Sequence, residues 1–184
     1  MDVIAAIKTR RSIRQYQSTP VSDSDLATVL EAARWAPSWA NTQCVRFMVV
    51  KDSQMKARVA DTLSQNNPAN VAIRQAPVLI VACAELKKSG YYHGQASTDK
   101  GDWFMFDVAL AMQNLVLAAC ALGLGTVYVG LFDAPRATSV LGVPEGFAVV
   151  AMTPLGYPAA EGRTPRRKEL SETVFYERWG TSSP

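Results

Sequence analysis

The sequence is poor in the residues that build metal centres, disulfide frameworks and hydrolase triads. It contains one histidine, His93, and three widely spaced cysteines, Cys44, Cys83 and Cys120. A single histidine excludes a histidine-rich metal site, and an odd number of cysteines without a CxxC pair argues against disulfides or zinc. Reduced thiols are typical of the cytoplasm, which is the predicted compartment. A hydrolase is disfavoured because the chain has no G-x-S-x-G elbow and His93 would be its only base.

Charged residues are also scarce, at 19% of the chain, and the net charge is only +3. So small an excess argues against a nucleic-acid-binding protein. The basic residues nevertheless gather in two clusters, one near each end of the sequence. The first holds Lys8, Arg10, Arg11 and Arg14, and the second holds Arg163, Arg166, Arg167 and Lys168. Because the rest of the chain is acidic, this pattern suits a small anionic ligand better than a long polyanion.

Only one apolar run, residues 103–122, has the length of a membrane span. It contains Asp107, Gln113 and Asn114, whose polar groups are expensive in lipid, and five alanines, which suit close helix packing. We therefore predict a buried central helix that stops at Gly123, and no membrane span. Such a helix needs cover on all sides, and a second subunit is a natural source of part of it.

The length of 184 residues suits one domain, predicted over 1–184. Apolar periodicity and turn residues predict helices over 2–9, 22–36, 54–63, 103–122 and 135–141, and strands over 47–50, 78–84, 126–129 and 148–154. The strand at 78–84 is a continuous apolar run, typical of a strand covered on both faces. Residues 86–100 form a polar stretch whose length is typical of lids and binding loops.

The first basic cluster has the pattern of a phosphate site. In an extended segment the side chains of Arg10, Ser12 and Arg14 lie on one side, which places two guanidinium groups and a hydroxyl together. The alternative is a solvated basic edge. Residues 166–168, taken alone, are typical of a solvated tail, but a phosphate shared by both clusters would explain why each is so concentrated.

Two further stretches could bind a flat ligand. The polar residues of 36–43 follow a helix and precede a buried strand, although proline, serine and asparagine also favour ordinary turns. Gly130 lies at the end of a predicted strand and has no side chain, so a flat ring could lie against its backbone. The alternative is that Gly130 is an ordinary glycine of a bulge or turn. The glycines of 123–126 are not a dinucleotide fingerprint, because a helix precedes them where a strand is required.

Five motifs then occur in order along nearly the whole chain. They are RRSIRQY, APSWANTQ, the D-x-x-x-A-x-x-N-L helix from Asp107 to Leu115, YVGLF, and LGYP followed by a basic stretch and ERWG. In this order and spacing the sequence resembles the short branch of the nitroreductase family. The resemblance implies an α+β fold with a central mixed sheet flanked by helices and a long buried central helix. It also implies a homodimer with FMN at the interface and a C-terminal arm that reaches to the partner.

The resemblance assigns FMN contacts to particular residues and requires no metal and no catalytic side chain. Those near the phosphate and ribityl end are Arg10, Arg11, Ser12 and Arg14, closed over by Arg166, Arg167 and Lys168, of which Arg167 is preferred. Those from the other subunit are Pro37, Ser38, Trp39 and Asn41, with Gln43 supporting the loop. Those along one side of the isoalloxazine are Tyr128, Val129, Gly130 and Leu131. Arg14 is the candidate to stabilise the reduced flavin.

The implied reaction takes hydride from NADH or NADPH and passes electrons to an electron-poor acceptor, such as a nitroaromatic or quinone, by a ping-pong mechanism. The stretch 86–100, with Trp103 and Phe104, is expected to shape the acceptor pocket. Candidates for the pyrimidine edge are Asn66, Asn67, Asn70 and Arg74. Cys44 and Val45 stand where the family often has Pro-Trp. An FMN-binding sensor or carrier, and a dehalogenating or flavin-fragmenting relative, remain alternatives.

Overall fold

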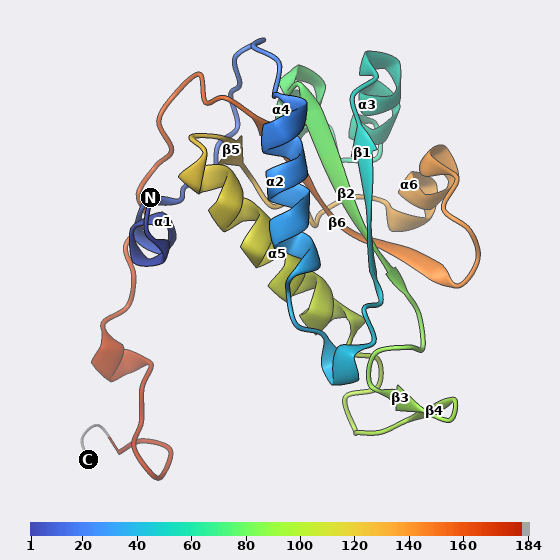
Figure 1. The fold of residues 1–184 in the computed structure, drawn as a ribbon, viewed down its shortest axis with the longest axis vertical. Coiled ribbons are helices and arrows are strands. Elements are labelled where there is room, and N and C mark those ends of the chain that lie inside the picture. Colours follow the sequence, from blue (N-terminus) through green and yellow to red (C-terminus); the bar gives the residue numbers. More distant parts are fainter. Residues whose placement is uncertain (182–184) are drawn as a thin grey trace.

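The computed structural model describes residues 1–181, so the last three residues of the predicted domain, 182–184, lie outside the described residues. Helices alternate with strands along the chain (Figure 1). The helices are α1 Val3–Thr9, α2 Asp23–Arg34, α3 Ser53–Ala60, α4 Ala69–Gln75, α5 Phe104–Ala121 and α6 Ala134–Leu141, with 3₁₀ turns η1 Trp39–Asn41 and η2 Leu170–Glu172. The strands are β1 Val45–Val50, β2 Val78–Glu85, β3 Tyr91–Tyr92, β4 Gln95–Ala96, β5 Gly125–Thr126 and β6 Phe147–Gly156.

The main sheet has four strands in the order β1-β2-β6-β5, and each neighbouring pair is antiparallel. A parallel bridge between Ser12 and Thr126 adds the N-terminal segment to its edge, which makes the sheet mixed. The side chains of β2 alternate between its two faces. Leu79 and Val81 pack in the core formed with α3, α4 and α6, whereas Val78 and Ile80 pack with α2 and α5. The predicted α+β fold with helices on both faces is therefore confirmed.

The central helix α5 follows the prediction in most respects. It packs against α2 and the sheet, and Gly123 follows it with a left-handed φ of 76°. By length and composition alone α5 could cross a membrane, as core helices of many proteins could. Only 39% of it is buried within one copy of the chain, and the side chains of Met105 and Phe106 are 60% and 54% exposed. The prediction of a fully covered helix is thus met only in part by a single copy.

Several local predictions need correction. Residues 69–75 form α4, where no element is predicted, and residues 91–96 form the β3–β4 hairpin inside the stretch expected to be a loop. The strand expected over 126–129 is reduced to β5 and a single bridge from Val129 to Met152. The helix α3 ends at Ala60 because the amides of Thr62 and Leu63 turn back to nearer carbonyls.

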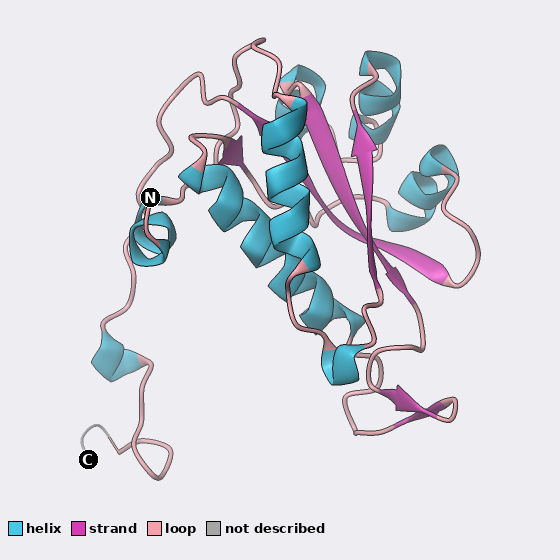
Figure 2. Cartoon of the chain, viewed as in Figure 1, coloured by secondary structure: helices cyan, strands magenta, loops and turns pink. Residues whose placement is uncertain are grey.

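After β6 the chain first packs against the N-terminal segment, where the Ala159 amide donates to the Gln15 carbonyl, and then leaves the body of the protein. Figure 2 shows it as loop interrupted by the single turn η2, running past the N-terminus and away from the sheet. Its large side chains are exposed, including Leu170 and Trp179, which is 91% exposed. Exposed apolar side chains of this size are typical of a surface that another chain covers.

Candidate functional site

The segment of Arg10, Ser12 and Arg14 is extended, as predicted, and the sheet holds it in place. The amide of Ile13 donates to the carbonyl of Thr126 at 2.9 Å, and Ile13 itself is buried. Gly125 permits this close approach, because a Cβ there would lie 2.8 Å from the Ile13 side chain. With Ile13 turned into the core, Ser12 and Arg14 face the opposite way, into a basic cavity.

The basic cavity has a volume of about 250 Å³. Four arginines line it that have no acidic partner within residues 1–181; they are Arg10, Arg14, Arg163 and Arg167. Arg11 also lines it, but its guanidinium donates to the carbonyls of Lys8 and Arg10 and to the Thr164 hydroxyl. Concentrated positive charge without local neutralisation favours a bound anion, and guanidinium groups match phosphate oxygens especially well.

A second cavity, of about 310 Å³, adjoins the first, and Arg14 lines both. Its wall contains Tyr128, Val129, Gly130 and Leu131, facing Asn66 and Asn67. The Asn67 amide donates to the Leu131 carbonyl at 3.0 Å, which ties the two walls together. A Cβ at Gly130 would meet nothing within 4 Å, so the backbone faces open space there. The two cavities thus offer an anion site joined to a slot with an exposed backbone face.

Tyr128 is held within this second wall by a hydrogen bond from its hydroxyl to Gln113 on α5, at 3.0 Å. Burial raises the pKa of Tyr128, and the nearby Arg10 guanidinium acts in the opposite direction. The phenol therefore remains protonated and can donate at neutral pH.

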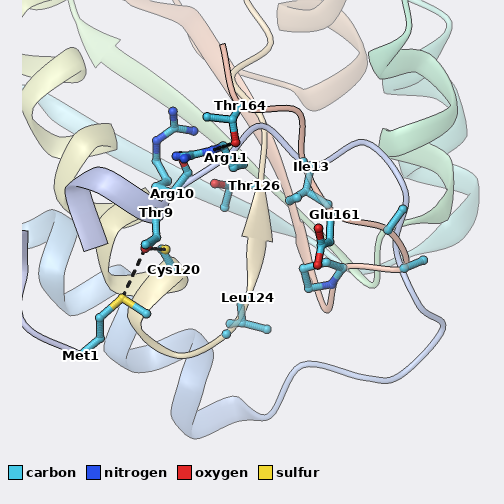
Figure 3. A pocket seen from close by; sticks show the side chains of 15 residues that line it. Met1, Thr9, Arg10, Arg11, Ile13, Cys120, Leu124, Thr126, Glu161 and Thr164 are labelled. Carbon is cyan, nitrogen blue, oxygen red and sulfur yellow. Dashed lines mark hydrogen bonds between the residues drawn. The ribbon is translucent and has the colours of Figure 1, made fainter. Parts of the chain in front are cut away.

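A third and larger cavity, of about 750 Å³, lies between α1, the C-terminal end of α5 and residues 158–164 (Figure 3). It shares Arg10 and Arg11 with the basic cavity and is otherwise lined mainly by small or apolar groups. The sulfur of Cys120 lies 3.8 Å from the Thr9 hydroxyl within it. This cavity continues the basic site toward the exposed face of α1.

The loop with Pro37, Ser38 and Gln43 lines a separate cavity of about 220 Å³. This loop is held at the N-terminal end of α5, where the Trp39 amide donates to Asp107 at 2.9 Å. The basic segment instead follows α1, which contacts Cys120 at the other end of α5. A helical rise of 1.5 Å per residue puts Asp107 and Cys120 about 20 Å apart. One copy of the chain therefore keeps the two predicted groups of site residues separate (Figure 1).

The remaining predicted residues differ in whether they line a cavity. Arg167 lines the basic cavity, whereas Arg166 and Lys168 are exposed and outside its lining. Trp39 and Asn41 belong to η1 and do not line the cavity beside it. Arg163 lines the basic cavity as well, although the family resemblance assigned it no FMN contact; its place in the second basic cluster was the signal for it. The chain crosses the basic segment at the adjacent Gly162, where a Cβ would lie 2.3 Å from that of Arg11.

Comparison with known proteins identifies the family of this chain. The model of the nitroreductase family matches residues 7–157. The chain belongs to the nitroreductase family. Its relatives include a Methanothermobacter thermautotrophicus protein named for NADH dehydrogenase and NAD(P)H nitroreductase activity, 32% identical over 97% of this chain and 88% of that protein. They also include the 5,6-dimethylbenzimidazole synthase of Rhodospirillum rubrum, 30% identical over 90% of this chain and 86% of that enzyme.

Among solved structures, a nitroreductase-type protein of Desulfovibrio desulfuricans in complex with FMN is 30% identical to this chain, with a TM-score of 0.77. The alignment covers 97% of this chain and 98% of that one. The names of these nitroreductase-family relatives describe different reactions. Family membership therefore supports a shared fold and leaves the acceptor to be argued from the site.

Proposed function

We propose that this chain is an NAD(P)H-dependent FMN oxidoreductase, with FMN held where the two cavities meet at Arg14. The observation that carries the proposal is the junction of four arginines, none with an acidic partner within residues 1–181, with a slot backed by Gly130. A flat ligand that ends in a phosphate suits both halves. The FMN complex of the 30% identical relative and the reductase names in the family support the same assignment.

When bound, FMN would supply the hydride chemistry, taking two electrons from NADH or NADPH and releasing them to the next substrate. The arginines of the basic cavity would hold its phosphate by charge-assisted hydrogen bonds. Arg14, at the junction of the cavities, is a fixed cation that stabilises negative charge developing nearby. The wall from Tyr128 to Leu131 excludes water from one side, and Asn66 and Asn67 present amide groups opposite it.

A second copy of the chain would complete the site, because one copy separates the loop of Ser38 from the basic cavity. Exposed apolar surface supports a homodimer: α1 exposes Val3, Ile4 and Ile7, and α5 exposes Met105 and Phe106. We place the C-terminal arm across the partner and Pro37, Ser38 and Asn41 against the partner's FMN. We also propose that residues 1–184 form one domain. We propose the cytoplasm as the compartment, because cysteine thiols stay reduced there.

The acceptor would be an electron-poor compound such as a nitroaromatic or quinone, which enters after the oxidised nicotinamide has left. The β3–β4 hairpin is suited to shape its entry, since it lies toward the N-terminal end of α5, where the Trp39 amide binds Asp107 (Figure 1). Trp103 anchors the hairpin: its indole donates to the Thr98 hydroxyl at 2.9 Å, and its ring packs on Gly90. Tyr92 and His93 contact each other at the exposed tip, with ring centroids 4.1 Å apart.

The visible spectrum of the purified protein with FMN tests the proposal. We expect bound flavin whose bands bleach under anaerobic NADH or NADPH and return when a quinone or nitroaromatic is added. Absence of bound flavin would contradict the assignment. Bound flavin that neither donor bleaches would favour a sensor or carrier, and bands that never return would favour a flavin-fragmenting relative.

Gly130→Ala is expected to weaken FMN binding without destabilising the fold. The added Cβ would project into the open space of the slot, and the φ of Gly130 lies outside the left-handed region. We expect the free energy of unfolding to stay within about 1 kcal/mol of wild type, while FMN affinity measured by fluorescence falls. Gly146→Ala is the matched control: its φ is 85° with open space around it, so it should cost about 1 kcal/mol of stability and leave FMN affinity unchanged. If Gly130→Ala and Gly146→Ala bound FMN with equal affinity, the flavin ring would not lie against Gly130.

A further inference from the structure

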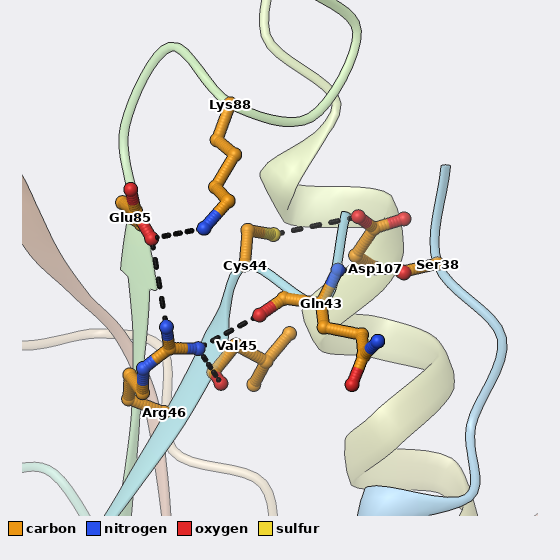
Figure 4. A network of polar contacts seen from close by, with 8 residues as sticks. All are labelled: Ser38, Gln43, Cys44, Val45, Arg46, Glu85, Lys88 and Asp107. Carbon is orange, nitrogen blue, oxygen red and sulfur yellow. Dashed lines mark hydrogen bonds and ion pairs between the residues drawn. The ribbon is translucent and has the colours of Figure 1, made fainter. Parts of the chain in front are cut away.

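A buried carboxylate lies beneath the loop of Ser38. Asp107 in the first turn of α5 is 1% exposed, and its two oxygens accept hydrogen bonds from two ends of one segment, of which Figure 4 draws the bond from Cys44. Oδ1 accepts from the Trp39 amide at 2.9 Å, and Oδ2 accepts from the Cys44 thiol at 3.4 Å. Within residues 1–181 no lysine, arginine or histidine forms an ion pair with it. Only its place in the first turn of a helix, where the dipole favours negative charge, adds to these two bonds.

The segment that Asp107 joins is strained. Ala40, Asn41 and Gln43 have left-handed φ values of 44°, 55° and 50°, a conformation that side-chain-bearing residues seldom adopt. Residues in such conformations persist only where the surroundings impose them. Ser38 contributes by accepting the amide of Gln43 at 2.9 Å, which closes the turn internally.

A second set of contacts holds the far end of the same segment. Arg46 donates to the carbonyl of Gln43 at 2.7 Å and lies 3.5 Å from the Glu85 carboxylate. Glu85 also accepts from Lys88 at 2.7 Å, at the start of the stretch that carries the β3–β4 hairpin. The segment 38–44 is therefore fixed by Asp107 on one side and by Arg46 on the other.

The protonation state of Cys44 determines the direction of its hydrogen bond to Asp107. Burial, reinforced by the hydrogen bond to Asp107, raises the pKa of the Cys44 thiol to about 12. The sulfur therefore stays protonated at neutral pH and donates to the carboxylate. Asp107 acts as an acceptor at both ends of the strained segment.

We propose that Asp107 is a positioning residue, whose carboxylate fixes residues 38–44 in the shape that meets FMN. This inference rests on the proposed function, in which that loop contacts the cofactor of the neighbouring copy. A merely structural role would make stability and FMN binding fall together. A positioning role separates them, because the carboxylate is buried without a counter-charge among the described residues and replacing it by a neutral group removes the cost of its desolvation.

Asp107→Asn in the full-length protein is the decisive variant. It keeps one oxygen for the Trp39 amide but removes the charge and turns an amide toward the Cys44 thiol. We expect an unchanged or higher unfolding temperature, together with FMN dissociation faster by about tenfold, the effect of losing a charge-assisted hydrogen bond. Hydrogen exchange at the Trp39 amide should also rise by about tenfold in flavin-free protein.

Asn114→Ala is the matched control, since Asn114 lies on the same helix and donates to the Ala32 carbonyl at 3.1 Å without contacting residues 38–44. It should leave both FMN dissociation and Trp39 exchange at wild-type values. The inference is overturned if Asp107→Asn leaves FMN dissociation and Trp39 exchange unchanged, or if it lowers stability and binding in proportion. Failure of the wild type to bind FMN would overturn the proposed function instead. Hydrogen exchange at the Trp39 amide would then still show whether Asp107 restrains the loop.

Discussion

Replacing Arg10 and Arg14 together with alanine should weaken FMN binding by about a hundredfold or more. Each guanidinium lines the basic cavity without an acidic partner in the described residues, so each is available for charge-assisted hydrogen bonds to phosphate. Such bonds contribute about 1.5–3 kcal/mol each, which corresponds to roughly tenfold or more per arginine. The dissociation constant measured by quenching of flavin fluorescence checks this expectation.

The same double variant should fold at least as stably as the wild type in the absence of FMN. Like charges gathered around one cavity repel, and removing two of them relieves that repulsion. Arg58→Ala provides the control, because Arg58 is exposed on α3 and also lacks an acidic partner within residues 1–181. A loss of FMN affinity in Arg58→Ala comparable to that of the double variant would mean that net charge, not the cavity, governs binding.

Mixing two defective variants should restore activity if the site lies between copies. An Arg14→Ala chain retains an intact loop, and a Ser38→Ala/Asn41→Ala chain retains an intact basic cavity. In a mixed dimer, one of the two sites combines both intact halves. After complete subunit exchange about a quarter of all sites should bind FMN normally, against almost none in either variant alone.

The control for this experiment is a mixture of Arg10→Ala and Arg14→Ala chains. Both lesions lie in the basic cavity, so every site in a mixed dimer keeps one defect and nothing is recovered. FMN retained after gel filtration measures the outcome in both mixtures. Recovery in neither mixture would place each complete site within one copy of the chain and contradict the proposed shared site.

Much of the local structure was predictable because short-range physics decides it. Ser22 accepts the amide of Asp25 at 3.0 Å and begins α2, as its hydroxyl and position predict. Gly123 follows α5 because glycine adopts a left-handed φ at little cost. The apolar run of β2 is covered on both faces, as its composition predicts. The helix α4 escaped prediction because the asparagines and proline of 66–70 are typical of turns, and the β3–β4 hairpin escaped it because two-residue strands give too little periodicity.

The family, the α+β fold and the extended basic segment could be predicted from the amino-acid sequence alone, because ordered motifs and alternating side chains are properties of the chain. Which arginines share a cavity depends on the tertiary structure, since Arg163 and Arg167 reach Arg10 and Arg14 from about 150 residues away along the chain. The tertiary structure also shows that Asp107 lies beneath the loop of Ser38 and that the length of α5 separates this loop from the basic cavity. Contacts between residues far apart in sequence depend on packing, which no local pattern encodes.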